Sequence, residues 1–184
     1  MPIFGDPETI AKSIQQKVLS QTGVWVRVGI SSNKILAKIA TDIWAKKNES
    51  GIFTLSKAEV ETLLWPQPVN KMFGVGSRMT AHFARLGMHT IGDIARTPLP
   101  RLKDKFRARF GKQSDIHAEV MWRTANGLDD SPVTPGTFNT PPKSVGHMMT
   151  LPRDYVETWE VNTILLELTE EVCRDCRRKG YMAL

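Results

Sequence analysis

The amino-acid sequence predicts a mostly helical α+β fold. Helical periodicity runs through most of the 184 residues, whereas strand patterns are confined to four short segments. Helices and strands alternate in the first 55 residues, and an all-helical stretch follows them. The sequence therefore predicts a small α/β piece with too few strands for a complete sheet, then a helical unit, and finally a partial βα piece with one long helix.

The α/β piece should begin with a helix that follows Asp6, because proline takes the first helical position and an acidic residue the next, and Gly23 should end it. Alternating valines predict a strand over residues 24–30, and residues 51–55 predict a second strand. Between them, the Ser-Ser-Asn sequence at 31–33 is expected to cap a second helix. The apolar positions expected to face the core are Ile10, Ile14 and Val18 in the first helix, and Ile35, Leu36, Ile39, Ala40 and Ile43 in the second.

The helical stretch is expected over residues 56–128. Ser56 and Glu59 form a capping box before its first helix, and Thr90 and Asp93 form another. Glycine caps that end helices are expected at Gly87, Gly111 and Gly127. The apolar positions expected to line the successive helices are Val60, Leu63 and Leu64; Val75, Met79, Phe83 and Leu86; Ile91, Ile94 and Ala95; Leu99, Leu102, Phe106 and Phe110; and Ile116, Val120 and Ala125.

The last third of the chain begins with residues 129–142, which contain four prolines and few apolar side chains, as is typical of a linker. Residues 144–151 then predict a strand, and the chain from Tyr181 onward predicts another. Because the chain stops within this last strand, we expect it to be a piece of a longer protein. Between the two strands a long helix is expected on Val161, Ile164, Leu165, Leu168 and Val172.

A glycine pair precedes one of the predicted helices, in the sequence Gly74-Val75-Gly76-Ser77-Arg78. Glycine takes positive φ at little steric cost and lets another backbone approach closely. The first amides of the following helix lack partners and lie at the positive end of its dipole, where a phosphate binds favourably. With the capped short helix after Thr90, this unit resembles a helix-hairpin-helix, which holds one DNA strand without reading bases. An ordinary glycine-containing helix connection is the alternative.

Composition favours a polyanionic partner. The formal net charge of +6 and the isoelectric point near 9.5 suit nucleic acid or an anionic membrane surface. No apolar run approaches the ~20 residues that span a bilayer, and the N-terminus lacks a signal-peptide pattern, so we expect a cytoplasmic protein. Cys173 and Cys176 form a C-x-x-C without a second Cys or His pair at zinc spacing, so two free thiols are expected.

The segment VGISSNKILAKIATD, residues 28–42, closely resembles a signature of the Y-family translesion DNA polymerases, the UmuC/DinB group. In that family this strand and helix belong to the palm, and a helix-hairpin-helix thumb, a linker and a little-finger domain follow. Lys143-Ser144-Val145-Gly146 is similar to the strand that opens the little finger. The resemblance implies a fragment that serves translesion synthesis, DNA repair and the SOS response to DNA damage. The implied domains are a partial palm at 1–55, a thumb at 56–128, a linker at 129–142 and a truncated little finger at 143–184.

The resemblance also implies site residues. Lys46 is similar to the family lysine that contacts the triphosphate of the incoming nucleotide. The thumb positions that hold backbone phosphates of the primer strand are Gly74, Val75, Gly76, Ser77 and Arg78. The little-finger positions that contact the template backbone are Lys143, Ser144, Gly146 and His147. These contacts would position the duplex without reading its sequence.

A polar stripe on the second helix is expected apart from the family resemblance. Its members recur every four residues: Lys34, Lys38, Asp42 and Lys46. Lysines at this spacing repel each other, which makes sense if a polyphosphate or a carboxylate site lies opposite; a solvated helix face is the alternative. We expect Asp42 to order the lysines rather than to bind metal.

Catalytic carboxylates are not found in this chain. Phosphoryl transfer of this kind uses two divalent metals, Mg²⁺ in the complete family enzyme, held by several carboxylates. The family supplies them from an Asp-containing strand and a Ser-x-Asp-Glu turn, which we expect before residue 1. The acidic residues present are dispersed over caps, a helix and the linker: Asp6, Asp42, Asp93, Asp129 and Asp130. We therefore assign no catalytic residue, metal ligand or bound cofactor, and we expect no DNA polymerisation by this chain alone.

Three interpretations stay open at this point. The chain is a fragment of a bypass polymerase, a non-catalytic helix-hairpin-helix module that binds DNA, or a truncated paralogue that occupies a polymerase's partners. The partners implied for the complete enzyme are primer–template DNA, a deoxynucleoside triphosphate and the sliding clamp, the last through a tail that this chain does not contain. No membrane partner is expected.

Overall fold

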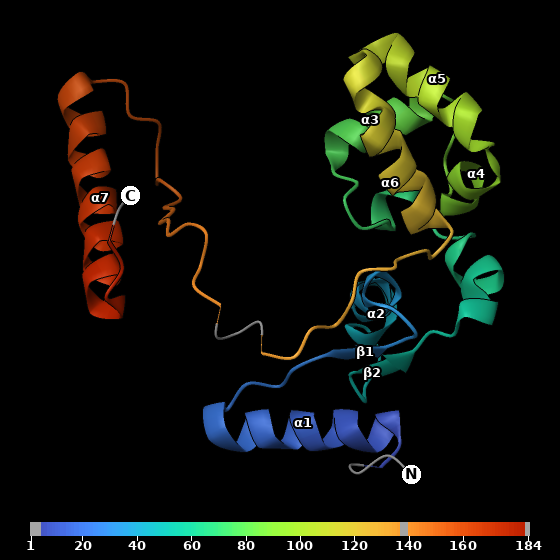
Figure 1. The fold of residues 1–184 in the computed structure, drawn as a ribbon, viewed down its shortest axis with the longest axis horizontal. Coiled ribbons are helices and arrows are strands. Elements are labelled where there is room, and N and C mark those ends of the chain that lie inside the picture. Colours follow the sequence, from blue (N-terminus) through green and yellow to red (C-terminus); the bar gives the residue numbers. More distant parts are fainter. Residues whose placement is uncertain (1–4, 137–139, 183–184) are drawn as a thin grey trace. The chain divides into compact units, whose positions relative to one another are not determined.

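The computed structural model describes residues 5–136 and 140–182, which fall into two compact units (Figure 1). The first unit ends at Pro132 and the second begins at Val133. The α/β piece and the whole helical stretch lie in the first unit. The division between the units falls within the proline-rich segment 129–142.

A βαβ crossover forms the centre of the α/β piece. Its elements are α1, Pro7–Thr22; β1, Val28–Ile30; α2, Lys34–Ala40; a π-helical turn, Thr41–Ala45; and β2, Ile52–Thr54. The two strands pair in parallel, with Gly29 opposite Phe53, and the sheet lies between α1 and α2 (Figure 1). The strand predicted over 24–30 is shorter than expected, because β2 offers only three partner residues and unpaired residues cannot extend a ladder.

The caps of both helices in this piece are those predicted. The Asp6 carboxylate accepts hydrogen bonds from the N–H groups of Glu8 and Thr9 at 3.0 and 3.1 Å. The Asn33 side-chain oxygen accepts one from the N–H of Leu36 at 2.9 Å. Each of these bonds satisfies an amide that the helix itself leaves without a partner, so both helices begin where the sequence predicted.

The buried face of α1 differs from the prediction. Ala11 and Gln15 are buried, whereas Ile14 is 48% exposed. Gln15 Nε2 donates hydrogen bonds to the carbonyl oxygens of Val26 and Ser50, at 3.0 and 3.1 Å. A buried amide costs little free energy when it is hydrogen-bonded. Apolar periodicity therefore missed a polar side chain that ties together the segments that lead into β1 and β2.

The helical stretch contains four α-helices and several short turns. Its elements are a 3₁₀ turn, Lys57–Glu59; a π-helical turn, Val60–Leu64; a 3₁₀ turn, Val69–Lys71; α3, Ser77–Arg85; α4, Ile91–Arg96; α5, Leu99–Phe110; a 3₁₀ turn, Lys112–Ser114; and α6, Asp115–Ala125. Both predicted capping boxes are present. Gly87 follows α3 with a φ of +70°, the left-handed conformation predicted for a glycine cap.

The apolar stripe predicted for α6 is wrong at Ile116 and Val120 and correct at Ala125, which is buried. Ile116 is 77% exposed and Val120 is 47% exposed. The buried residues of α6 are Ala118, Met121, Thr124 and Ala125. Three of these are small, and α6 packs against both α4 and α5. Small side chains allow that close packing, whereas the periodicity analysis favoured larger apolar residues.

One hydrophobic core joins the α/β piece to the helical stretch. Leu36 and Ile39 of α2 belong to the same buried cluster as Phe83 of α3 and Phe106 of α5. The chain that follows α6 also approaches α2 closely, because a Cβ at Gly127 would lie 2.9 Å from a methyl carbon of Leu36. The two parts are therefore held by shared packing, which fixes the site residues of α2 relative to those of the helices.

The second unit contains α7, Thr158–Lys179, which ends before Gly180 at a φ of +69°. None of the residues of α7 is buried. The strand predicted over 144–151 is wrong, because a strand needs a partner and residues 140–182 contain none. The strand predicted from Tyr181 falls partly outside the described residues, and residues 181–182 have no regular structure. Within 5–136 and 140–182, no helix has the length and apolar character needed to cross a membrane.

Gly29 should be the most sensitive position of the small sheet. A Cβ there would lie 2.1 Å from the carbonyl oxygen of Ala37 and 2.5 Å from the hydroxyl oxygen of Thr41. We expect Gly29→Ala to lower the free energy of unfolding by about 3 kcal/mol, because α2 cannot move away without disturbing the core. Urea unfolding followed by circular dichroism measures the change.

Gly76→Ala is the control for this experiment. Nothing lies within 4 Å of the Cβ position at Gly76, so its unfolding free energy should stay within about 0.5 kcal/mol of wild type. Equal stability of Gly29→Ala and wild type would contradict the packing of β1 against α2.

Candidate nucleic-acid interface

The segment from Met72 to Arg78, here called the glycine corner, turns the chain from the 3₁₀ turn into α3. Met72 and Val75 are buried and anchor it to the core. Gly74 has a φ of +84°, a conformation that favours glycine, and its Cβ position is 3.2 Å from the terminal carbon of Met121. Gly74 is therefore required by the turn itself.

Gly76 behaves differently from Gly74. Its backbone is extended, with φ −87° and ψ −176°, and any residue can adopt these angles. Nothing lies within 4 Å of its Cβ position. Backbone conformation therefore does not require glycine at position 76. What distinguishes Gly76 is the open space in front of its backbone.

The N-terminus of α3 begins at this open position. No side chain caps it, and Thr80 donates the first backbone hydrogen bond of the helix to the carbonyl oxygen of Gly76 at 2.9 Å. The amides that precede Thr80 lie in the first turn, which an α-helix leaves without internal partners. Ser77 and Arg78 are exposed, and a hollow lined by Asn70, Gly76 and Ala81 lies beside Ser77. Chemically, the corner offers N–H donors, a hydroxyl and a guanidinium to an anion.

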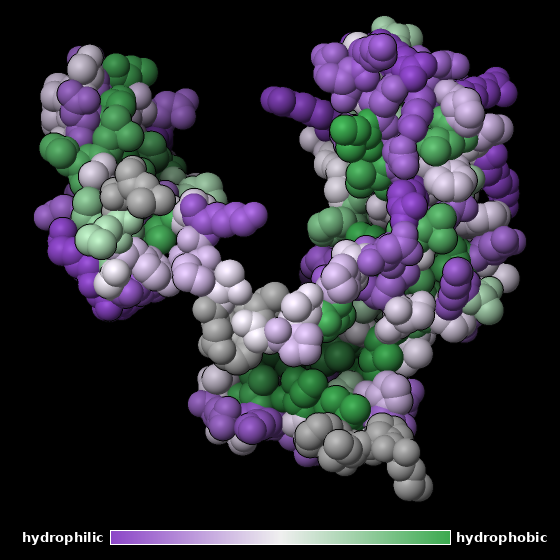
Figure 2. Space-filling model, viewed as in Figure 1, coloured by the Kyte–Doolittle hydropathy of each residue, from purple (hydrophilic) through white to green (hydrophobic). Residues whose placement is uncertain are grey.

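The positive charge of the chain is concentrated in the helical stretch. Residues 56–128 contain twelve Lys and Arg and six Asp and Glu, a difference of +6 that equals the formal net charge of the chain. Hydrophilic side chains cover much of this part on the face shown in Figure 2. The charge of the first unit therefore favours an anionic partner, most strongly at the helices.

The predicted polar stripe begins on α2 and continues through the π-helical turn, where Asp42 lies between Lys38 and Lys46. The Asp42 carboxylate contacts Lys46 Nζ at 2.6 Å and Lys38 Nζ at 2.9 Å. Hydrogen bonds from Lys46 and then Lys38 lower the pKa of Asp42. The expectation that Asp42 orders the lysines is confirmed. Both lysines are about half exposed, at 57% and 48% of the side chain, so they can exchange the carboxylate for a phosphate.

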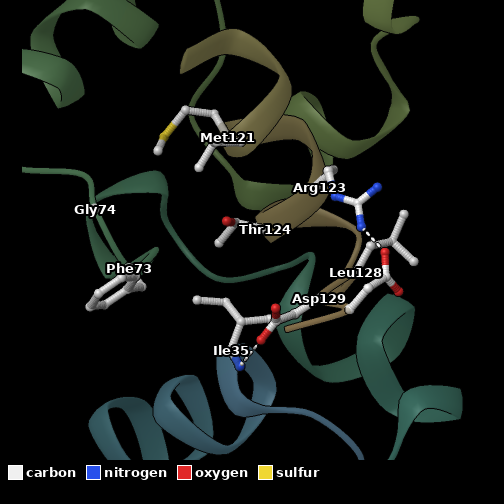
Figure 3. Close-up of a pocket in the computed structure, with 10 residues that line it drawn as sticks. Ile35, Phe73, Gly74, Met121, Arg123, Thr124, Leu128 and Asp129 are labelled. Atoms are coloured by element: carbon white, nitrogen blue, oxygen red, sulfur yellow. Dashed lines mark hydrogen bonds and ion pairs between the residues drawn. The ribbon is translucent and has the colours of Figure 1, made fainter. Parts of the chain in front are cut away.

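A pocket of about 330 Å³ lies between α2, the glycine corner and α6 (Figure 3). Ile35, in the first turn of α2, and Gly74, in the glycine corner, both line this pocket. Phe73, Met121 and Thr124 face the same space (Figure 3). Sequence reasoning did not identify this pocket, because its lining comes from segments that are far apart in the chain.

Asp129 lines this pocket and is fixed there by hydrogen bonds. Its carboxylate accepts hydrogen bonds from the N–H of Ile35 at 3.2 Å and the N–H of Ser131 at 3.0 Å. The hydroxyl and N–H of Ser131, together with the N–H of Ile35, lower the pKa of Asp129. Asp129 was predicted only as a dispersed linker acid. Its role as a second cap of α2 could be found only from the fold, because 94 residues separate it from Ile35.

The remaining predicted site residues lie in the second unit. Lys143, Ser144, Gly146 and His147 belong to a segment without regular structure. His147 Nε2 lies 3.3 Å from a carboxylate oxygen of Asp175 on α7, and this contact lowers the pKa of Asp175. These four residues are close together in the chain, and His147 is held against α7.

Metal-binding geometry is not found among the described residues. In 5–136 and 140–182, no three His, Cys, Asp or Glu side chains gather where they could hold an ion. Asp42 is already engaged by two lysines. Cys173 and Cys176 are free thiols, as expected. The residues present do not fit a two-metal site.

Comparisons with known proteins give a consistent result. The model of the impB/mucB/samB family matches residues 2–42, and that of the impB/mucB/samB family C-terminal domain matches residues 142–183. DNA polymerase IV 2 of Bacillus subtilis (strain 168) is 51% identical over 98% of this chain and 42% of its own length. DNA polymerase IV 2 of Halalkalibacterium halodurans is 44% identical over the same shares. The DNA repair protein homolog YobH of Bacillus subtilis is 36% identical, over 91% of this chain and 74% of its own length.

The carboxyl group of Asp42 should titrate below the usual range for aspartate. We expect Lys46→Gln to raise its pKa more than Lys38→Gln, because the Lys46 contact is shorter. Since the folded-state pKa is below the unfolded value of about 3.9, the ion pairs stabilise the fold above that pH. This stabilisation is lost as the pH falls through the folded-state pKa. Carboxyl ¹³C NMR titration measures the pKa, and identical values in wild type and both variants would contradict the geometry.

Proposed function

Because this chain belongs to the impB/mucB/samB family of Y-family DNA polymerases, we propose that it grips primer–template DNA for translesion synthesis and DNA repair. The chain spans about two fifths (42%) of the length of the DNA polymerase IV relatives. The polymerase activity, its nucleotide substrate and its Mg²⁺ therefore belong to a complete enzyme. The function of this chain within it is to hold the duplex.

The uncapped N-terminus of α3 is the observation that carries this proposal. Gly76 has no conformational need to be glycine, yet a side chain there would occupy the space in front of the first helical amides. A backbone phosphate of the primer strand fits that space, where Gly74, Val75, Gly76, Ser77 and Arg78 surround it. The contacts are independent of sequence, as bypass of damaged bases requires. We assign residues 56–128 to a thumb with a helix-hairpin-helix on this basis.

Two further contacts complete the proposed grip. Lys46 binds the triphosphate of the incoming nucleotide, with Asp42 as the counterion that holds it in place until the phosphate arrives. Residues 143–184 form part of a little finger, and its opening segment contacts the template backbone. The residues of that contact are Lys143, Ser144, Gly146 and His147. Residues 1–55 are the corresponding part of the palm, and 129–142 the linker.

The chemistry of the complete enzyme requires clustered carboxylates, and residues 5–136 and 140–182 contain no such cluster. We propose that the residues of this chain bind and orient DNA, and that carboxylates of the complete enzyme supply the magnesium ligands for the bond-making step. The same observation favours a second candidate for the chain taken alone, a non-catalytic DNA-binding module. A sliding clamp as partner, the SOS response and a cytoplasmic location follow from the proposed role at damaged DNA.

Gly76→Asp should separate DNA binding from stability. An aspartate at this N-cap position accepts hydrogen bonds from the first amides of α3, so we expect the free energy of unfolding to rise by about 0.5 kcal/mol. The same carboxylate should repel a phosphate and weaken binding of a primer–template duplex at least about tenfold. Fluorescence anisotropy and urea unfolding measure the two effects.

Gln16→Glu is the matched control, because it adds one negative charge on the exposed part of α1. We expect it to bind the duplex within about twofold of wild type. Undiminished binding by Gly76→Asp would remove the glycine corner from the interface.

Primer extension tests the division between binding and chemistry. With Mg²⁺ and all four deoxynucleoside triphosphates, we expect this chain to bind a labelled primer–template but to leave the primer unextended. A full-length DNA polymerase IV serves as the positive control on the same substrate. Clear extension by this chain would mean that its carboxylates do form a catalytic metal site.

A further inference from the structure

A second basic site lies at the end of α3 away from the glycine corner. A hollow of about 350 Å³ is bounded there by Leu86 and Gly87, and Arg96 of α4 and Arg101 and Lys105 of α5 line it. The nine residues of α3 separate this hollow from the corner by about 13 Å along the helix axis. One ligand group therefore cannot fill both places.

The positive charge in the hollow is only partly compensated by the described residues. In the described residues, Arg96, Arg101 and Lys105 form no ion pair, although the neighbouring Lys103 and Arg107 do. Asp93 is the one acidic residue in the lining. Its carboxylate already accepts hydrogen bonds from the N–H groups of His89 and Thr90, at 2.9 and 2.8 Å, and these lower its pKa. The lining keeps a net charge of +2.

Arg96 is held in place before any ligand arrives. Its guanidinium lies 5.0 Å from the centre of the Trp65 ring, and Trp65 Nε1 donates a hydrogen bond to the carbonyl oxygen of Ala125 at 3.1 Å. Gly92 lets Trp65 approach α4, because a Cβ there would lie 3.0 Å from the Cβ of Trp65. A guanidinium stacked on an aromatic face keeps its in-plane N–H donors for an oxyanion.

Arg101 and Lys105 approach the same hollow from α5. They are four residues apart, so they lie on one face of the helix, and their like charges repel each other modestly. An anion between them would remove that cost. The hollow thus combines the guanidinium groups of Arg96 and Arg101 with the ammonium group of Lys105. Guanidinium groups offer paired N–H donors, so this set suits a tetrahedral oxyanion with more than one negative charge.

We propose that this hollow binds a phosphate group and is a second phosphate site, separate from the glycine corner. Two sources share this chemistry: a small phosphate compound such as pyrophosphate, and the backbone of a nucleic acid. The site rests on its own geometry, so it does not depend on the glycine corner binding DNA.

The side-chain N–H of Trp65 provides a local probe, since its ring lies beneath Arg96. In ¹H–¹⁵N NMR we expect inorganic pyrophosphate to shift this resonance saturably. The double variant Arg101→Gln/Lys105→Gln should raise the dissociation constant at least about tenfold. The control Lys12→Gln/Lys17→Gln removes two exposed cations from α1 and should stay within about twofold of wild type. An unchanged Trp65 resonance in the free variants checks that the fold is intact.

The absence of a saturable shift at Trp65, or equal dissociation constants for the two double variants, would overturn the site. A short DNA duplex then identifies the source. If backbone phosphates occupy the hollow, Arg101→Gln/Lys105→Gln should reduce the log–log salt slope of binding by about 1–2. A slope equal to that of the control assigns the site to small phosphate compounds. Gly76→Asp should leave the pyrophosphate shift unchanged, so failure of the corner and failure of the hollow give different results.

Discussion

The attachment of α2 to the chain that follows α6 is the constraint on which the first unit depends. Asn33 Nδ2 donates a hydrogen bond to the carbonyl oxygen of Gly127 at 2.8 Å, and Asp129 accepts one from Ile35 at 3.2 Å. Both bonds lie at the N-terminus of α2, and Leu36 packs against Gly127 directly below them. Because Lys38 of α2 pairs with Asp42, which also contacts Lys46, a displacement of α2 would move the proposed nucleotide contact. Met121 of α6 lies 3.2 Å from the Cβ position of Gly74, so α6 contacts the glycine corner while the chain that follows it contacts α2.

The two parts of the first unit differ in how acidic residues compensate the charge of the basic ones. Along the polar stripe, Asp42 contacts two lysines at hydrogen-bond distance and compensates part of their charge, and with Lys34 the stripe keeps a net charge of +2. In the helical stretch, basic residues outnumber acidic ones two to one. Ion pairs neutralise some of these, such as Lys103 with Glu119, and leave others open to solvent. A carboxylate that a phosphate can displace suits a ligand that binds and dissociates. A surface with uncompensated positive charge suits a polyanion that is bound along an extended contact.

Three glycines show why a residue type alone does not reveal its role. Gly29 is required because a side chain would strike α2, and Gly74 because its φ is positive. Gly76 meets neither condition, so the space around it is available to a ligand. The sequence suggested the same two reasons for Gly74 and Gly76, a positive φ and the close approach of another backbone. In the structure, Gly74 is required for the turn, whereas Gly76 leaves open the approach to the N-terminus of α3.

Local patterns in the sequence by themselves determined the helix caps, the order of the elements in the first unit and the family. Asp6, Asn33 and Thr90 cap helices as predicted, because a cap depends on residues only two or three positions away. Only the tertiary structure decided which faces are buried: Gln15 is buried in α1 while Ile14 is exposed, and Ala118 and Met121 are buried in α6 in place of Ile116 and Val120. It also decided that Asp129 caps α2 and that Arg96, Arg101 and Lys105 line one hollow. These contacts join segments that are distant in sequence, and periodicity carries no information about such distances.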